Sequence, residues 1–282
     1  IIRKLEKEGK LQETQKLMEK YKNHSMEEKK EVFKEIHDFF GGHIRLLLSG
    51  AAALDKNVEQ AFRDWGINLC QGYGLTETSP VIAVETNSNF RVGSVGKAVP
   101  HVEARLEDVN EEGIGELVVK GPNIMLGYFE NEEATKEAIV DGWFHTGDLA
   151  TIDEDGYIFI CGRKKSVIVL KNGKNIFPEE MENLVNKITG VKESFIFGKS
   201  TKKDKDDVKI YSKIVFDRDI VKEAYNAYEQ EDIYNAINNK IKEINSTMPP
   251  YKAIRGIVLS ETPLIKTTTS KIKRQEEIKT IV

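Results

Sequence analysis

Residues 44–70 have the sequence IRLLLSGAAALDKNVEQAFRDWGINLC, which predicts the fold class of the first part of the chain. The apolar run at 44–48 predicts a short strand, and the small residues after it predict a turn. Residues 54–65 then place apolar side chains at helical spacing, Gly66 ends that helix, and 67–70 predicts a second strand. Because strand–turn–helix–strand order is typical of a parallel sheet, we expect an α/β unit here.

The segments on either side of this stretch predict other structures. Residues 1–40 carry apolar residues three or four apart among Lys, Glu and Gln, which favours helices that end at Gly41-Gly42. Residues 92–161 are typical of a small, mostly antiparallel β region that a helix near 131–139 interrupts. Its strands are expected at 102–106, 115–120 and 156–161.

From residue 162 the pattern becomes α+β. Apolar runs flank Lys171-Asn172-Gly173, a hairpin-type turn, and Pro178 suits the first position of a helix. The charged run at 201–207 is expected to form a solvated hairpin tip, and a domain boundary is expected within 161–166. The remaining elements are strands at 191–197, 208–216 and 254–260 and helices over 219–245 and 274–281.

Length, composition and charge exclude several classes of protein. The 282 residues indicate about two domains of roughly 150 residues each. With 39% hydrophobic and 31% charged residues the chain is neither fibrous nor of low complexity, and a net charge of −4 offers no basic field for nucleic acid. Two cysteines, Cys70 and Cys161, exclude a disulfide scaffold and favour a reducing compartment. The longest apolar stretches are too short to cross a bilayer.

Two motifs in the first part of the chain suit a nucleotide. In QGYGLTET, residues 71–78, small residues let backbone N–H groups face an anion, Thr76 offers a hydroxyl donor, Glu77 an oxygen ligand for magnesium and Tyr73 a flat face for a base. In WFHTGDL, residues 143–149, Asp148 follows a glycine turn and can accept two hydroxyl hydrogen bonds from a ribose. Taken alone, each motif is better explained by a capped tight turn, and His145 by a structural role.

Two cationic motifs follow. Residues 162–180 crowd cations between the candidate domains, where ligand clefts commonly form, and Arg163 can donate a fork of N–H groups to ribose or phosphate. In PLIKTTTSKIKR, residues 263–274, Lys271 follows small hydroxyl residues and precedes an apolar one. A solvated linker and a basic surface loop are the alternatives.

In this order and spacing, the four motifs resemble the C-terminal half of an adenylate-forming enzyme of the acyl-CoA synthetase (AMP-binding) superfamily, most like a long-chain fatty acid–CoA ligase. The resemblance runs from about residue 41 to the end. The segment NGKNI followed by PEE favours a fatty acyl substrate over acetate or an aryl acid. The matching positions are 49–52, 73–77, 115–117, 121, 127–129, 146–148, 162–165, 172–176, 178–180 and 271–274.

The resemblance implies a fold and a role for each matching residue. Residues 1–162 would be the C-terminal part of a large α/β adenylation domain with a small antiparallel β region, and 163–282 a small mobile α+β lid. Thr76 would hold the α-phosphate, Glu77 the Mg²⁺, and Asp148 and Arg163 the ribose hydroxyls. The implied adenine contacts are Gly50, Ala51, Ala52 and Tyr73; the implied hinge is Lys165, the catalytic lysine Lys271 and the CoA tunnel residue Gly173.

The implied reaction joins a fatty acid to CoA in two steps. The carboxylate attacks the α-phosphorus of ATP to give acyl-AMP and pyrophosphate, and the CoA thiol then displaces AMP. Lys271 and a magnesium ion at Glu77 would neutralise charge on the phosphate oxygens. Neither cysteine is needed as a nucleophile, so both are expected to be buried apolar residues.

The sequence departs from the family pattern in three ways. Ser166 stands where many relatives have Asp, and Ser270 replaces the Gly that often precedes the catalytic lysine. No Ser/Thr/Gly-rich phosphate loop with its own Lys occurs upstream, and the chain starts at Ile1 without a Met. We therefore expect a piece of a longer enzyme that is inactive alone.

Other readings stay open. The chain could belong to another adenylate former, such as an aryl acid or short-chain acid ligase or a peptide-synthetase adenylation domain. A reading of another class makes residues 163–282 a non-catalytic docking module, and binding of a nucleotide would separate the two. We expect a cytoplasmic protein, with peripheral membrane contact left open. The nearly balanced charges of the Lys-rich helix over 1–36 favour a solvated face.

Overall fold

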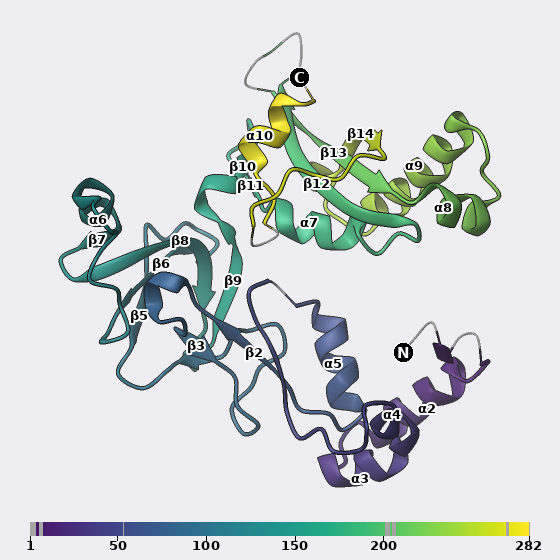
Figure 1. Cartoon of the computed structure of the whole chain (residues 1–282), viewed down its shortest axis with the longest axis horizontal. Helices are drawn as coiled ribbons and strands as arrows, with labels where there is room; N and C mark the ends of the chain where they lie inside the picture. The colour runs from purple at the N-terminus through teal and green to yellow at the C-terminus, as the bar shows by residue number, and fades with distance from the viewer. Residues whose placement is uncertain are drawn as a thin grey trace. The chain divides into compact units, whose positions relative to one another are not determined.

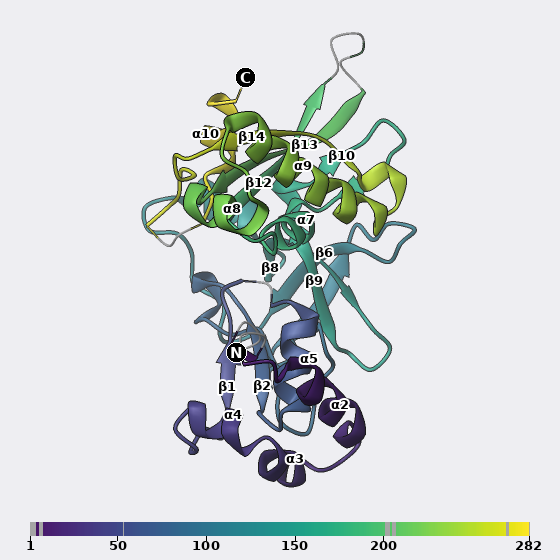
Figure 2. The same ribbon diagram turned by 90° about the vertical axis from the view of Figure 1, so that its right-hand side faces the viewer.

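The computed structural model describes residues 4–5, 8–52, 54–200, 204, 207–268 and 271–281 (Figures 1 and 2). The chain forms two compact units: unit 1 is Ile1–Ile160 and unit 2 is Cys161–Val282. The assignment of residues 1–162 and 163–282 to an adenylation domain and a mobile lid remains a prediction. No described helix is both long enough and apolar enough to cross a membrane.

Unit 1 opens with the helices that residues 1–40 predict, in separate pieces. These are α2 (Leu11–Tyr21), α3 (Met26–Val32) and α4 (Lys34–Phe39). Ser25 begins α3 with a capping box, because its hydroxyl accepts the Glu28 N–H at 3.2 Å and its own N–H donates to the Glu28 carboxylate at 2.9 Å. The apolar faces of these helices bury Phe33 and Ile36 against Trp65 and Ile67.

The predicted strand–helix–strand unit is present. Strand β1 (Leu47–Ser49) pairs in parallel with β2 (Leu69–Tyr73), and α5 (Lys56–Asp64) connects them. The strands start two or three residues later than the apolar runs predict, and α5 starts after Asp55, whose carboxylate accepts the N–H groups of Asn57 and Val58. Two short antiparallel strands, β3 (Ala83–Val84) and β4 (Lys97–Ala98), complete this sheet.

A second, antiparallel sheet of five strands follows, as the sequence predicts. Its strands are β5 (Glu103–Glu107), β6 (Gly115–Lys120), β7 (Ile139–Val140), β8 (Trp143–Ile152) and β9 (Ile158–Arg163), with α6 (Glu132–Ala138) before β7. The prediction of a turn at 143–149 is wrong, because these residues lie inside β8. Leu117, Val119, Phe144 and Ile158 form its buried core.

Unit 2 is the predicted α+β fold. Strand β12 (Val191–Ser200) pairs antiparallel with β13 (Val208–Phe216), which pairs in parallel with β14 (Ile254–Ser260). The connection from β13 to β14 runs through α8 (Arg218–Tyr225) and α9 (Gln230–Ser246), because parallel neighbours need a crossover. The unit also holds the hairpin β10 (Ile168–Val169) and β11 (Asn175–Ile176), α7 (Pro178–Val185) and α10 (Arg274–Lys279).

Candidate functional site

A bulge in β8 positions Asp148. The pairing register between β6 and β8 shifts between Glu116 and Val118 of β6. Gly147 of β8 has a φ of 68°, a backbone conformation that residues with a side chain disfavour. The bulge is braced from within: the Thr146 hydroxyl donates to Leu117 O at 2.7 Å and accepts the Asp148 N–H at 3.1 Å. A turn-like Thr-Gly-Asp sequence therefore occurs inside a strand, and it re-aims the Asp148 side chain.

Asp148 meets Tyr73 across unit 1. Tyr73 ends β2, and its hydroxyl donates to Asp148 Oδ2 at 2.5 Å. Asp148 is 4% exposed, so its carboxylate needs such a donor. The structure thus brings together two predicted site residues that lie 75 positions apart.

The turn after β2 presents Thr76 and Glu77. A Cβ on Gly74 would lie 1.7 Å from Pro80 O, so only glycine fits at this close approach. The segment then forms a short 3₁₀ turn at Thr76–Thr78, where the Thr78 hydroxyl accepts the Leu75 N–H at 3.0 Å. Thr76 is exposed and Glu77 is half-buried.

A second loop packs on this turn and supplies Tyr128. The Tyr128 hydroxyl donates to Glu77 Oε1 at 3.0 Å, and the Met125 N–H donates to Glu77 O at 2.8 Å. Asn123 donates to Thr78 O and Val81 O. Sequence reasoning gave Tyr128 no role, although it lies in the matching segment 127–129.

The donors at Glu77 suit a magnesium ion that also binds a substrate. Mg²⁺ is commonly held by one or two carboxylates together with substrate phosphates rather than by a cage of protein ligands. A single half-buried carboxylate beside an exposed hydroxyl fits that mode. Among the described residues, no group of three or more His, Cys, Asp or Glu side chains could hold a metal ion by itself.

The turn predicted to face the adenine follows β1. Ser49 pairs with Gln71, two residues before Tyr73, and a Cβ on Gly50 would lie 3.5 Å from Gly72 O. Ala51 has a φ of 67°, which is uncommon for a residue with a side chain, and Ala51 and Ala52 are both exposed. This turn therefore lies beside β2.

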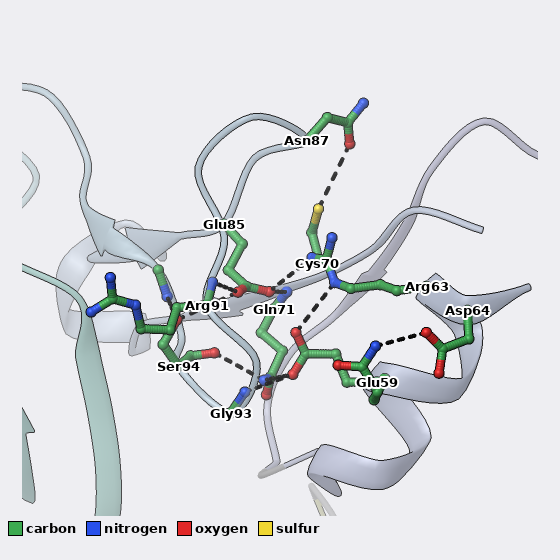
Figure 3. Close-up of polar contacts among 12 residues, drawn as sticks. Glu59, Arg63, Asp64, Cys70, Gln71, Glu85, Asn87, Arg91, Gly93 and Ser94 are labelled. Carbon is green, nitrogen blue, oxygen red and sulfur yellow. Dashed lines mark hydrogen bonds and ion pairs between the residues drawn. The ribbon is translucent and has the colours of Figure 1, made fainter. Parts of the chain in front are cut away.

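A cluster of buried polar side chains forms hydrogen bonds with Gln71 of β2 (Figure 3). Gln71 donates its side-chain amide to Glu59 Oε2 at 2.8 Å and to Ser94 O at 2.9 Å, and its backbone N–H to Glu85 Oε2 at 2.9 Å. Burial raises the pKa of the Glu59 carboxyl above its ordinary value. Sequence reasoning missed this cluster, because its members are ordinary polar residues on an amphipathic helix, a strand and loop segments that lie far apart in the sequence.

Cys70 and Cys161 differ in burial. Cys70 is 1% exposed, and burial raises the pKa of its thiol, so it is the inert apolar residue expected. Cys161 is only half-buried, so that part of the expectation is wrong. All residues of β9 after Ile158 are half-buried, so the small apolar side chain of Cys161 does not by itself lead to full burial.

The remaining predicted site residues lie in unit 2 on separate segments. Arg163 ends β9, and Lys165 follows in an exposed 3₁₀ turn, Lys164–Ser166. Gly173 has a φ of 78° in the β10–β11 turn, where Lys174 N–H donates to the Asn172 side chain at 3.1 Å. Ser270 and most of the charged run 201–207 lie outside the described residues.

Lys271 lies in a small hairpin rather than in a plain loop. Its N–H donates to the Thr267 hydroxyl at 3.1 Å, the Thr267 N–H donates to Lys271 O at 2.8 Å, and Lys266 and Ile272 form an antiparallel bridge. The residue is exposed. The hairpin therefore presents the lysine at the surface of unit 2.

Comparison with known protein families gives two matches. Residues 8–129 match the model of the AMP-binding enzyme, and residues 165–280 match the model of the AMP-binding enzyme C-terminal domain. The first match lies in unit 1 and the second lies in unit 2. Together they include every predicted site residue except Asp148 and Arg163.

Three curated relatives are similar to part of this chain. The chain is 41% identical over 152 residues to the long-chain-fatty-acid–CoA ligase FadD15 of Mycobacterium bovis, which covers 54% of this chain and 24% of the ligase. It is 41% identical over 152 residues to the long-chain-fatty-acid–CoA ligase of Salmonella typhimurium (52% and 27%). It is 36% identical over 179 residues to long chain acyl-CoA synthetase 3 of Arabidopsis thaliana (60% and 27%). The chain thus spans about a quarter of each relative.

Solved structures share the fold. ATP-bound MatB from Rhodopseudomonas palustris is 28% identical with a TM-score of 0.64, over 85% of this chain and 46% of that one. The anthranilate CoA ligase AuaEII, in complex with anthranoyl-AMP, is 25% identical with a TM-score of 0.65, over 84% and 44%. These similarities confirm the expected α/β plus α+β fold class.

Proposed function

This chain belongs to the AMP-binding enzyme family, and we propose that it is the C-terminal part of a fatty acid–CoA ligase. The reaction would convert a fatty acid, ATP and CoA into acyl-CoA, AMP and pyrophosphate through an acyl-adenylate. Curated relatives that are named long-chain-fatty-acid–CoA ligases support the acyl substrate. Because the chain spans about a quarter of their length, the activity is assigned to the whole protein.

The observation that carries the proposal is the contact between Tyr73 and Asp148 beside the 74–78 turn. It places a buried carboxylate, an exposed hydroxyl at Thr76 and a half-buried carboxylate at Glu77 in one region of unit 1. The Asp148 carboxylate has two oxygens and can accept hydrogen bonds from two ribose hydroxyls. These hydrogen bonds would replace the one that it accepts from the Tyr73 hydroxyl. The Tyr73 ring would then be available to the adenine, beside the turn at Gly50.

Phosphate activation would come from the neighbouring turn. The Thr76 hydroxyl would donate to an α-phosphate oxygen, and Glu77 would hold Mg²⁺ with its orientation fixed by Tyr128. When bound, the magnesium ion supplies positive charge that stabilises the phosphate oxygens during attack. Both the carboxylate and the triphosphate are anionic, so the barrier of this step is largely electrostatic.

Unit 2 would supply the mobile cations. Lys271 would neutralise charge on the phosphate during adenylation, and Arg163 would bind the ribose hydroxyls from the end of β9. Lys165 would serve as the hinge, since an exposed charged side chain stays solvated in more than one orientation. Gly173, at a turn where a Cβ would meet nothing within 4 Å, would leave room for the pantetheine arm of CoA.

ATP–pyrophosphate exchange tests the proposal on the whole protein with a panel of carboxylic acids. We expect exchange with fatty acids, and a loss of about 10²- to 10³-fold in Lys271→Ala. Lys279→Ala, which removes another exposed lysine of unit 2, is the matched control and should exchange at the wild-type rate. Equal rates in wild type and Lys271→Ala would contradict the role of Lys271, and preference for an aryl or short-chain acid would contradict the substrate.

A second test separates the ligase from a docking module. A non-hydrolysable acyl-AMP analogue should raise the melting temperature of the whole protein, and Asp148→Asn should weaken that shift. A docking module would show no shift. We expect the 282-residue chain alone to exchange at the background rate, because the upstream phosphate loop is absent from it.

A further inference from the structure

The segment that carries Lys271 needs support from outside itself. We call residues 265–268 and 271–273 the Lys271 hairpin; Lys273 N–H donates to Ile265 O at 2.9 Å and Thr267 N–H to Lys271 O at 2.8 Å. A two-stranded hairpin of this size is marginally stable in water when it stands alone. The direction in which Lys271 points therefore depends on what holds the two ends.

Arg274 holds the C-terminal end. Its guanidinium forms a two-pronged pair with Glu182 of α7, with Nη1 2.9 Å from Oε1 and Nη2 2.7 Å from Oε2. Glu182 is 6% exposed and also accepts the Ile196 N–H of β12 at 2.9 Å. The pair thus ties the residue next to the hairpin to both a helix and the central sheet.

Glu277 holds the N-terminal end. Its Oε2 accepts the Ile265 N–H at 2.8 Å, and its Oε1 pairs with Lys213 of β13. Glu277 is fully buried. Both ends of the hairpin therefore close on buried carboxylates, and the Lys271 side chain projects from a segment whose base is fixed.

We propose that Arg274 and Glu182 are positioning residues that hold the Lys271 hairpin in the orientation adenylation requires. This inference rests on the proposed function. Neither side chain needs to touch a reactant. A planar guanidinium bound to both oxygens of one carboxylate fixes direction as well as distance, which a single-point contact such as that of Lys213 does not.

The placement of the pair explains why it suits this task. Only two residues separate Lys271 from Arg274, so a rotation of Arg274 would move the lysine. Burial raises the pKa of the Glu182 carboxyl, and the hydrogen bonds and charge of Arg274 oppose that rise. Removing one partner of such a pair strands the other charge in a buried position, so the two side chains are held to each other.

A double-mutant cycle on the whole protein tests the inference by ATP–pyrophosphate exchange. Glu182→Gln and Arg274→Lys should each lower the rate about 10- to 100-fold, because small misplacements of a reacting group have effects of that size. Adding Glu182→Gln to Lys271→Ala should cause no further loss, since the pair acts only through Lys271. Glu261→Gln, which removes another carboxylate paired with an arginine, Arg218, should leave the rate unchanged.

Two results would overturn the inference. An equal fold-loss from Glu182→Gln in the wild-type and Lys271→Ala backgrounds would show a general structural role. Amide hydrogen exchange gives a second readout that does not need activity: Glu182→Gln must speed exchange at Thr267 and Lys273, and wild-type rates there would reject the pair. If wild type itself exchanges no pyrophosphate, the proposed function fails, and the amide rates alone then decide whether the pair holds the hairpin.

Discussion

Each unit pairs an arginine with at least one buried carboxylate, and the two clusters are built differently. In unit 1, Arg63 Nε lies 3.5 Å from Glu59 and Nη2 lies 3.6 Å from Glu85, and neither nitrogen makes a hydrogen bond (Figure 3). In unit 2, Arg274 binds both oxygens of Glu182 at 2.9 and 2.7 Å. One arginine compensates charge at a distance, whereas the other makes a directed pair.

The difference shows what each cluster accomplishes. In unit 1 the carboxylates take their hydrogen bonds from neutral donors, such as the Gln71 amide and the Gly93 N–H, while Arg63 stacks 3.5 Å from the Phe90 ring. These donors fix β2 and the loop beside it. In unit 2, Arg274 itself makes the hydrogen bonds that join its segment to Glu182 of α7. Removing the cation should therefore be more damaging in unit 2.

The largest effect is expected for Arg274→Met. It leaves Glu182 buried without its partner, so unit 2 should lose about 3–5 kcal/mol of stability. Both tryptophans of the chain, Trp65 and Trp143, lie in unit 1, so their fluorescence reports unit 1 alone. Amide hydrogen exchange in β12 and β13, measured at increasing urea concentration, should show the loss of stability in unit 2. The unfolding transition detected by tryptophan fluorescence should not change.

A smaller loss is expected for Arg63→Met. Its neighbouring carboxylates keep their neutral donors, so unit 1 should lose about 1–3 kcal/mol, the cost of leaving a buried polar group poorly compensated. Tryptophan fluorescence in urea measures this change directly. A loss larger than that of Arg274→Met would reverse the comparison, and the directed pair would then not be the stronger one.

The pH dependence of the two units should differ in sign at two buried glutamates. Burial raises the pKa of Glu59, so the folded state binds more protons, and its contribution falls as pH rises above 4.5. Burial also acts to raise the pKa of Glu277, but the Ile265 N–H and Lys213 lower it, so its contribution is lost as pH falls below 4.5.

The matched variants isolate those contributions. Subtracting the stability of Glu59→Gln from that of wild type should give a difference that declines with rising pH in unit 1. The same subtraction with Glu277→Gln should give a difference that declines with falling pH in unit 2. If the two stability differences changed with pH in the same direction, one of the two carboxyl groups would not have the pKa shift that its contacts in the structure produce.

The smallest effect is expected for Ser94→Ala. The Ser94 hydroxyl lies 3.4 Å from Glu85 Oε1 and accepts the Gly96 N–H at 3.1 Å, so unit 1 should lose about 1 kcal/mol. Tryptophan fluorescence in urea is again the measurement. A loss as large as that of Arg63→Met would show that the neutral donors, rather than the arginine, provide most of the compensation.

The sequence predicts local structure well and distant pairing poorly. Hydrophobic spacing and Gly66 place α5 and its strands within a few residues, and Pro178 marks the first residue of α7. The prediction of a turn at Thr146-Gly147-Asp148 is wrong, because a bulge and a turn both use a glycine with positive φ.

The residues that hold the site lacked a local signal. Arg274 and Glu182 are 92 positions apart, and Tyr128 and Glu77 are 51 apart. Each looks like an ordinary polar residue in its own segment. Only the fold brings each pair together, whereas the nucleotide motifs are contiguous and can be read directly.

Measuring the two half-reactions separately in Lys271→Ala of the whole protein shows whether this lysine acts on the phosphate. One assay measures formation of acyl-AMP from fatty acid and ATP, and the other measures transfer from supplied acyl-AMP to CoA. If Lys271 acts on the phosphate, acyl-AMP formation falls about 10²- to 10³-fold while transfer to CoA stays near the wild-type rate. Equal losses in both half-reactions, or no loss in the first, would show that Lys271 does not act on the phosphate during adenylation.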